Sequence, residues 1–363
     1  MTASTDGILR GYLSDNAAGA PPEILEALSA AAVGPAAPYA NDPLSARVRH
    51  TLAEVFEHPV DVFLVGTGSA ANGISLAALT PPWGAVLAHP NAHINNDEAG
   101  APEFFTNGAK IVGVDGPNSK IAPTALYAAA RRMVGDVHCV QPSVVSLTQA
   151  TETGSVYSLA ELHELGGIAR TAGLRVHLDG ARFANALVSL NASPADMSWR
   201  AGVDVLSFGA TKNGALTADA ILSFDPSLST QLAFRHKRGG QLTSKMRFQS
   251  AQVDAYLRDD LWLRNARHAN AMAARLATGL AGTTARSGTP TRGIPGVRVL
   301  GSVDANIIFV QLAEPIAAAL TSAGFGFYGG RWDPGVFRFV TSFAHQASDI
   351  DALIEAVVAA GVS

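Results

Sequence analysis

Short apolar runs alternate with amphipathic stretches through the first two thirds of the chain. The apolar, β-branched runs predict strands at 60–65, 85–88, 111–115, 144–148, 174–178, 203–208 and 219–224. Helices are expected at 22–32, at 44–57, from the glycines after residue 65 to about 79, at 124–134, and after Ser158, which forms a capping box with Glu161. Strands that alternate with helices predict an α/β fold with a mostly parallel sheet covered on both faces.

From about residue 245 the pattern changes. Residues 245–281 predict one long helix, and the Gly/Thr/Pro/Arg stretch 282–296 predicts a loop. Strand 305–312, helix 314–323, strand 336–341 and helix 349–360, with Ser348 as N-cap, complete a smaller α+β unit. We therefore expect a large domain over 1–245, including an N-terminal arm, and a small domain over 246–363.

Composition narrows the class of protein. Charged residues make up only 15% of the 363 residues and the net charge is −4, so neither nucleic acid nor an anionic membrane is an expected partner. Residues 62–96 carry no Asp, Glu, Lys or Arg, but glycines and prolines interrupt them, which argues against a membrane span. Cys139 is the single cysteine, so we expect no intramolecular disulfide and no metal site. Without a basic, apolar leader at its start, the chain is expected to be cytoplasmic.

Lys212 has the most unusual setting of the five lysines, because it alone follows an apolar strand and lies among small residues. Desolvation disfavours an ammonium group, and a neutral amine is a nucleophile towards aldehydes. The alternative is a lysine that extends from a loop into solvent.

A glycine-rich turn follows the first strand of the pattern. Gly66 to Ala71 matches the G-x-G-x-x-G/A dinucleotide fingerprint, but the acidic ribose partner is missing, since the next acidic residue is Asp97. A helix N-terminus with small residues and hydroxyls still suits a single phosphate group. An ordinary glycine-rich turn between strand and helix is the alternative.

Charged side chains are expected at other strand ends and loops. Asp179 ends an apolar strand, where it either caps the next helix or holds a cationic ring nitrogen protonated. Arg182 is then an ion-pair residue or a carboxylate clamp. His93 is either a satisfied loop histidine or a residue that stacks on a planar ring and passes protons. Arg338, on an apolar strand, needs an internal or a bound anion.

A phosphate site, an aspartate for a ring nitrogen and a lysine for an aldehyde match the three groups by which a protein can bind pyridoxal phosphate: its phosphate, its ring nitrogen and its aldehyde. The sequence therefore predicts this cofactor, bound to the large domain.

Eight segments, which run in order along nearly the whole chain, are similar to one enzyme family. They are Ser14 to Asn16, Tyr39 to Pro43, Gly68 to Asn72, His93 with Asp97 to Phe105, Thr148 to Gly154, His177 to Phe183, Phe208 to Gly214 and Gly240 to Phe248. Together they resemble the low-specificity L-threonine aldolases of the β-eliminating-lyase group, and in particular a bacterial branch that includes phenylserine aldolases.

The resemblance implies a PLP-dependent transferase-like fold (fold type I) and a role for each matching residue. Lys212 is the implied Schiff-base lysine, Asp179 the partner of the pyridine nitrogen, and His93 the histidine that stacks on the ring. The remaining implied cofactor ligands are Gly68, Ser69, Thr211 and Arg182, and the implied ligands of the substrate carboxylate are Ser14, Arg182 and Arg338. Arg235, Lys237 and Arg238 lie where the family often supplies a basic group from a neighbouring subunit, and which one serves stays open.

The chain departs from the commoner family pattern at two places. Leu13 stands where many members have Arg, and Gln149 to Thr153 stand where many have Glu-Asn-Thr-His-Asn. Glu152 therefore replaces a histidine discussed as the base for the substrate hydroxyl, so the base is expected to be Glu152, His93 or a water that they hold.

The resemblance implies cleavage of L-threonine, L-allo-threonine or a related L-β-hydroxy-α-amino acid, such as phenylserine, to glycine and an aldehyde. It also implies a homotetramer built from two dimers. The alternatives are β-elimination, racemisation or transamination on the same scaffold, and a non-catalytic nicotinamide-dinucleotide-binding protein.

Overall fold

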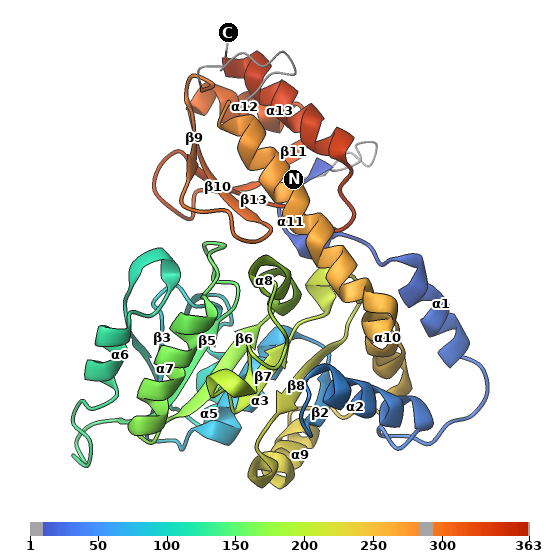
Figure 1. The fold of residues 1–363 in the computed structure, drawn as a ribbon, viewed down its shortest axis with the longest axis vertical. Coiled ribbons are helices and arrows are strands. Elements are labelled where there is room, and N and C mark those ends of the chain that lie inside the picture. Colours follow the sequence, from blue (N-terminus) through green and yellow to red (C-terminus); the bar gives the residue numbers. More distant parts are fainter. Residues whose placement is uncertain (1–9, 283–292, 362–363) are drawn as a thin grey trace. The chain divides into compact units, whose positions relative to one another are not determined.

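The chain forms two compact units in the computed structural model, which describes residues 10–282 and 293–361. The large unit spans residues 20–264, and the smaller unit combines the residues up to 19 with those from 265 onward (Figure 1). The boundary expected near residue 245 lies inside the large unit, because helix α10 (Arg247–Leu257) packs against the helices at the start of that unit. The N-terminal arm belongs to the smaller unit instead of the large one.

A seven-stranded sheet in the order β2-β8-β7-β6-β5-β3-β4 forms the centre of the large unit. Within this sheet β8 is antiparallel to both of its neighbours, and the other adjacent pairs are parallel. The predicted mostly parallel sheet is thus confirmed. The strands are β2 (Asp61–Val65), β3 (Gly84–Ala88), β4 (Lys110–Gly113), β5 (Gln141–Thr148), β6 (Arg175–Gly180), β7 (Val205–Phe208) and β8 (Asp219–Ser223).

The helices of the large unit follow the predicted pattern with exceptions. The capping box is confirmed: the Glu161 amide donates to Ser158 Oγ at 3.2 Å, and the Ser158 amide donates to Glu161 Oε2 at 2.7 Å. No residue range was predicted for α8, for α9 or for the short helices α4 and α5. The helices are α1 (Pro22–Ala31), α2 (Pro43–Val55), α3 (Gly68–Leu79), α4 (His93–Asn96), α5 (Ala101–Thr106), α6 (Pro123–Ala129), α7 (Leu159–Thr171), α8 (Phe183–Leu190), α9 (Ser229–Arg238) and α10.

The long helix predicted over 245–281 is wrong. A turn at Arg258–Asp260 divides it into α10 and α11 (Leu261–Leu280). Asp259 and Asp260 have φ values of 50° and 55°, in the left-handed region that ends a right-handed helix. Two adjacent aspartates in an Ala/Leu/Arg-rich stretch were the available sequence signal.

The smaller unit contains a four-stranded antiparallel sheet in the order β12-β13-β10-β9. The predicted N-cap Ser348 is wrong, because α13 begins at Ala347 and therefore contains Ser348. Asp349 Oδ2 accepts from the Gln346 amide, just before the helix, at 2.8 Å. Most of the loop expected at 282–296 lies outside the described residues. The elements are β9 (Val297–Leu300), β10 (Ile307–Leu312), β12 (Tyr328–Gly329), β13 (Val336–Val340), α12 (Glu314–Ser322), α13 (Ala347–Gly361), and β1 (Arg10–Gly11), which pairs with β11 (Phe325–Gly326).

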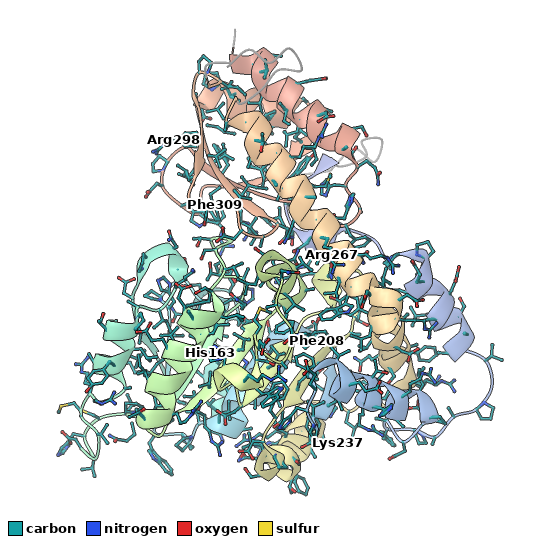
Figure 2. All side chains as sticks on the ribbon, in the orientation of Figure 1. His163, Phe208, Lys237, Arg267, Arg298 and Phe309 are labelled. Carbon is teal, nitrogen blue, oxygen red and sulfur yellow. The ribbon has the colours of Figure 1, made fainter. Side chains whose placement is uncertain are left out.

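Phe208, the last residue of β7, lies in the core of the large unit (Figure 2). Its ring packs edge-on against Phe56, Phe183 and Trp262 with centroid distances of 6.0, 5.8 and 5.8 Å. Aromatic packing of this kind fixes the end of β7, from which the chain turns to Lys212. No helix within residues 10–282 and 293–361 has both the length and the apolar character of a membrane span.

Candidate active site

The predicted site residues of the large unit follow the carboxyl ends of adjacent parallel strands. His93 follows β3, Glu152 follows β5, Asp179 lies at the end of β6 and Lys212 follows β7. The strand ends are level, since Thr148, the last residue of β5, pairs with Asp179. Ligands of open α/β sheets bind beyond such ends.

The charges of three of these side chains act on the fourth, His93. A hydrogen bond of 2.8 Å from His93 Nδ1 to Glu98 Oε1 raises the pKa of His93 above its ordinary value of 6.5, against the effect of burial. The charges of Glu152 and Asp179 also raise this pKa, and the charge of Lys212 lowers it. The pKa of one histidine therefore depends on Lys212 and on three carboxylates, of which Glu152 and Asp179 lie at or after the ends of strands and Glu98 lies between α4 and α5.

Asp219, the first residue of β8, fixes the turn that carries Lys212. Its Oδ1 accepts from the amides of Ala210 and Thr211 at 2.8 and 3.0 Å. The carboxylate is buried and binds both amides from the same side, so the single turn Thr211–Asn213 has a defined start. Lys212 is half-buried at the centre of this turn, which differs from a lysine extended into solvent.

The other side of the turn is also anchored. Asn213 donates through Nδ2 to Tyr256 Oη and to the Trp262 carbonyl, both at 2.8 Å. A Cβ at Gly209 would lie 2.5 Å from the Ala181 carbonyl oxygen, so only glycine allows β7 to end this close to the turn after β6. The lysine-bearing turn and the aspartate-bearing turn are therefore in direct contact.

The N-terminus of α3 has the features of an anion site. Thr67 caps the helix by accepting from the Ala70 amide at 3.1 Å, and the amides of Gly68 and Ser69 have no carbonyl in the preceding turn to donate to. The space beside Gly68 is open, since nothing lies within 4 Å of the position of a Cβ. The buried hydroxyl of Thr211 has no hydrogen-bond partner among the described residues. Open space beside amides that lack a carbonyl partner fits a phosphate group.

Asp179 is 3% exposed, and each of its carboxylate oxygens accepts a hydrogen bond. Oδ1 accepts from the Ala181 amide and Oδ2 from Asn72 Nδ2, both at 3.0 Å. The alternative that Asp179 caps the next helix is wrong, because Arg182 occupies the N-cap position of α8. Arg182 itself is 6% exposed. A carboxylate in this position is suited to pair with a cationic group such as a protonated ring nitrogen.

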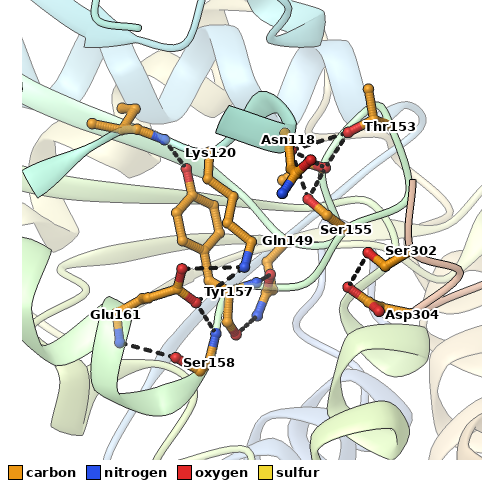
Figure 3. Close-up of polar contacts among 12 residues, drawn as sticks. Asn118, Lys120, Gln149, Thr153, Ser155, Tyr157, Ser158, Glu161, Ser302 and Asp304 are labelled. Carbon is orange, nitrogen blue, oxygen red and sulfur yellow. Dashed lines mark hydrogen bonds and ion pairs between the residues drawn. The ribbon is translucent and has the colours of Figure 1, made fainter. Parts of the chain in front are cut away.

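The loop that carries Glu152 is held by hydroxyl groups (Figure 3). The Thr151 amide donates to the Ser155 carbonyl at 2.9 Å, which closes the loop. Ser155 Oγ and Thr153 Oγ1 both donate to the Asn118 carbonyl, at 2.7 and 3.0 Å. Glu152 is half-buried in this loop, and its charge acts on His93. Glu152 thus follows the end of β5 and its charge acts on His93, while its role stays a prediction.

Ser14 and Arg338 belong to the smaller unit. Ser14 Oγ accepts from the Asn16 amide at 3.2 Å, as the N-cap of a short turn. The Arg338 guanidinium lies 5.2 Å from the ring centroid of Tyr328 and 5.6 Å from that of Trp332. Their role at a substrate carboxylate stays a prediction.

Sequence reasoning assigned no role to Asn72, Glu98 or Asp219. Asn72 donates to both Glu98 and Asp179, and Asp219 orders the Lys212 turn. The available signal was a polar side chain in an apolar context: Asn72 lies in a helix of small, buried residues, and Asp219 opens an apolar strand.

Comparison with known proteins identifies the family of this chain. The profile of the beta-eliminating lyase family matches residues 12–292. A low specificity L-threonine aldolase of Pseudomonas aeruginosa is 42% identical over 92% of each chain, and another from a Pseudomonas species is 38% identical over 95% of this chain and 98% of its own. A solved threonine aldolase structure from Leishmania major is 27% identical, covers 96% of this chain and 98% of its own, and superimposes with a TM-score of 0.87. This chain belongs to the beta-eliminating lyase family.

Proposed function

We propose that this enzyme is a pyridoxal-phosphate-dependent aldolase that cleaves L-threonine, L-allo-threonine or a related L-β-hydroxy-α-amino acid to glycine and an aldehyde. We base the proposal on the positions of His93, Glu152, Asp179 and Lys212 at the carboxyl ends of adjacent parallel strands of one sheet. Sequence identity to two low specificity L-threonine aldolases over nearly the whole chain supports the same reaction.

The residues present fit the cofactor. The Lys212 amine would be the covalent anchor for its aldehyde, and the Asp179 carboxylate would pair with its protonated ring nitrogen. The amides of Gly68 and Ser69 would bind its phosphate, and Thr211, whose buried hydroxyl has no hydrogen-bond partner among the described residues, would be a further ligand. When bound, pyridoxal phosphate supplies an electron sink for the bond that is broken.

Side chains around the cofactor determine which bond breaks. Arg182 binds the substrate carboxylate, and a fixed carboxylate orients the Cα–Cβ bond for cleavage. Glu152 or His93 accepts the proton of the β-hydroxyl, and the hydroxyl carbon leaves as the aldehyde. A positioned general base contributes about 10²–10⁴-fold to a rate, so Glu152→Gln lowers kcat by this factor if Glu152 is the base. A smaller loss of kcat in Glu152→Gln identifies His93 as the acceptor of the β-hydroxyl proton.

Product analysis tests the proposal. Purified protein with pyridoxal phosphate is incubated with L-threonine, L-allo-threonine or L-phenylserine, and glycine and aldehyde are quantified. We expect equal amounts of both products, no product from Lys212→Ala, and normal turnover from Lys110→Ala, a matched change at an exposed lysine. Absence of glycine with all three substrates, or formation of keto acid, racemised amino acid or ammonia in its place, contradicts the proposal.

We also propose a cytoplasmic homotetramer made of two dimers. Large apolar side chains on the outside of the large unit, such as Phe104 at 78% and Phe234 at 75% exposure, support burial between subunits. Light scattering of the purified protein measures the mass, and a mass equal to one chain contradicts this assembly.

A further inference from the structure

Glu98 lies between α4 and α5, and its side chain is completely removed from solvent. An ionised carboxylate in such a place is costly unless it is hydrogen-bonded or paired. Its surroundings therefore show what it does in the fold.

The two contacts of Glu98 Oε1 determine the proton position on His93. Oε1 accepts from Asn72 Nδ2 and from His93 Nδ1, both at 2.8 Å. A carboxylate that already accepts from an amide N–H accepts again from Nδ1–H. In the neutral ring the hydrogen therefore lies on Nδ1, and Nε2 is the basic atom.

Asn72 connects this pair to the aspartate of the site. Its amide nitrogen has two hydrogens, of which one goes to Glu98 and the other to Asp179 Oδ2 at 3.0 Å. One buried amide thus separates two buried carboxylates and binds both. The histidine, Glu98 and Asp179 are consequently held in one rigid network.

The charges that face His93 come from four elements. Glu98 precedes α5, Glu152 lies in the loop after β5, Asp179 ends β6, and Lys212 follows β7. The first three stabilise an imidazolium and Lys212 opposes it, and Glu98 has the largest effect. It is also the one of the four with a hydrogen bond to the ring among the described contacts.

We propose that Glu98 is a positioning residue that keeps the hydrogen of His93 on Nδ1 and leaves Nε2 as the ring atom that exchanges protons at the active site. This inference rests on the proposed function, in which His93 lies beside the cofactor and substrate. It gives a role to a carboxylate whose side chain is completely buried between α4 and α5.

The test is nitrogen NMR of the full-length protein, loaded with pyridoxal phosphate and labelled with ¹⁵N-histidine. The His93 signals are assigned by their loss in His93→Asn. We expect an Nδ1–H tautomer and a pKa above 6.5, because Glu98 stabilises the cation. Glu98→Gln lowers this pKa, whereas the matched change Glu164→Gln at an exposed position of α7 does not.

An Nε2–H tautomer in the unmodified protein overturns the proposal, even if Glu98→Gln does not fold. An unchanged His93 pKa in folded Glu98→Gln overturns it as well. Turnover gives a second readout: the acid limb of the kcat profile moves to lower pH in Glu98→Gln. If the NMR result is as expected but no substrate is cleaved, the proposed function fails and the positioning role of Glu98 stands.

Discussion

Asp219 offers a direct test of how the Lys212 turn is built. Its Oδ1 binds the amides of Ala210 and Thr211, so Asp219→Ala leaves two amides next to the lysine without their acceptor. Asp219→Asn retains an oxygen of the same size in the same place. The two variants separate the loss of the hydrogen bonds from the loss of the charge.

The expected magnitudes follow from the two bonds. A hydrogen bond to a charged group contributes about 1.5–3 kcal/mol, and one between neutral groups about 0.5–1.5 kcal/mol. Asp219→Ala is therefore expected to lower the free energy of unfolding by about 3–6 kcal/mol. Asp219→Asn keeps two neutral hydrogen bonds and is expected to lower it by about 2 kcal/mol.

Urea unfolding, followed by circular dichroism at one fixed protein concentration, measures both values. Retention of the yellow colour of the bound cofactor after gel filtration reports whether Lys212 is still in place. We expect Asp219→Ala to lose the colour and Asp219→Asn to keep it. If Asp219→Ala unfolds at the same urea concentration as the unmodified protein and stays yellow, the turn is not fixed by Asp219.

Three further predictions concern the strands and loops around the site. His177 is hydrogen-bonded between Ser146 and Ser207, and burial lowers its pKa to about 4. Between pH 6.5 and 4 the unfolded chain therefore binds a proton at this histidine that the native chain does not bind. The free energy of unfolding therefore falls by up to about 3 kcal/mol as the pH is lowered from 6.5 to 4. His177→Gln is expected to remove this part of the dependence of the unfolding free energy on pH, measured by urea unfolding, and an unchanged dependence contradicts the burial argument. Gly209→Ala places a Cβ 2.5 Å from the Ala181 oxygen, and is expected to destabilise the protein by about 1–3 kcal/mol and to reduce cofactor retention. Thermal unfolding measures this loss, and full stability in Gly209→Ala contradicts the close approach. Ser155→Ala removes one hydroxyl from the Asn118 carbonyl and is expected to lower unfolding free energy by about 1 kcal/mol in the same assay, a loss that would be absent if the loop were held elsewhere.

The strand-end residues were predictable because their signal is local. Each of Asp179 and Lys212 follows an apolar, β-branched run, and parallel strands bring their carboxyl ends to one edge of the sheet. The helix start at Ser158 was predictable for the same reason, since both members of the capping box lie within one turn.

The network around these residues was not predictable from local pattern. Asn72 and Asp179 are 107 positions apart and meet only when α3 packs on the sheet. The break at Asp259 and Asp260 was missed because left-handed backbone in an otherwise helical composition leaves little periodic signal. Contacts between distant segments are set by packing, which periodicity in a single sequence does not encode.

Mapping of the lysine that binds the cofactor tests the central claim most directly. Borohydride reduction of the protein loaded with pyridoxal phosphate fixes the cofactor covalently to its lysine, and mass spectrometry of the digested protein identifies the peptide. We predict that the added mass lies on Lys212 and that Lys212→Ala carries none. The account is contradicted if the mass lies on Lys110, Lys120, Lys237 or Lys245, or if the reduced protein carries no cofactor.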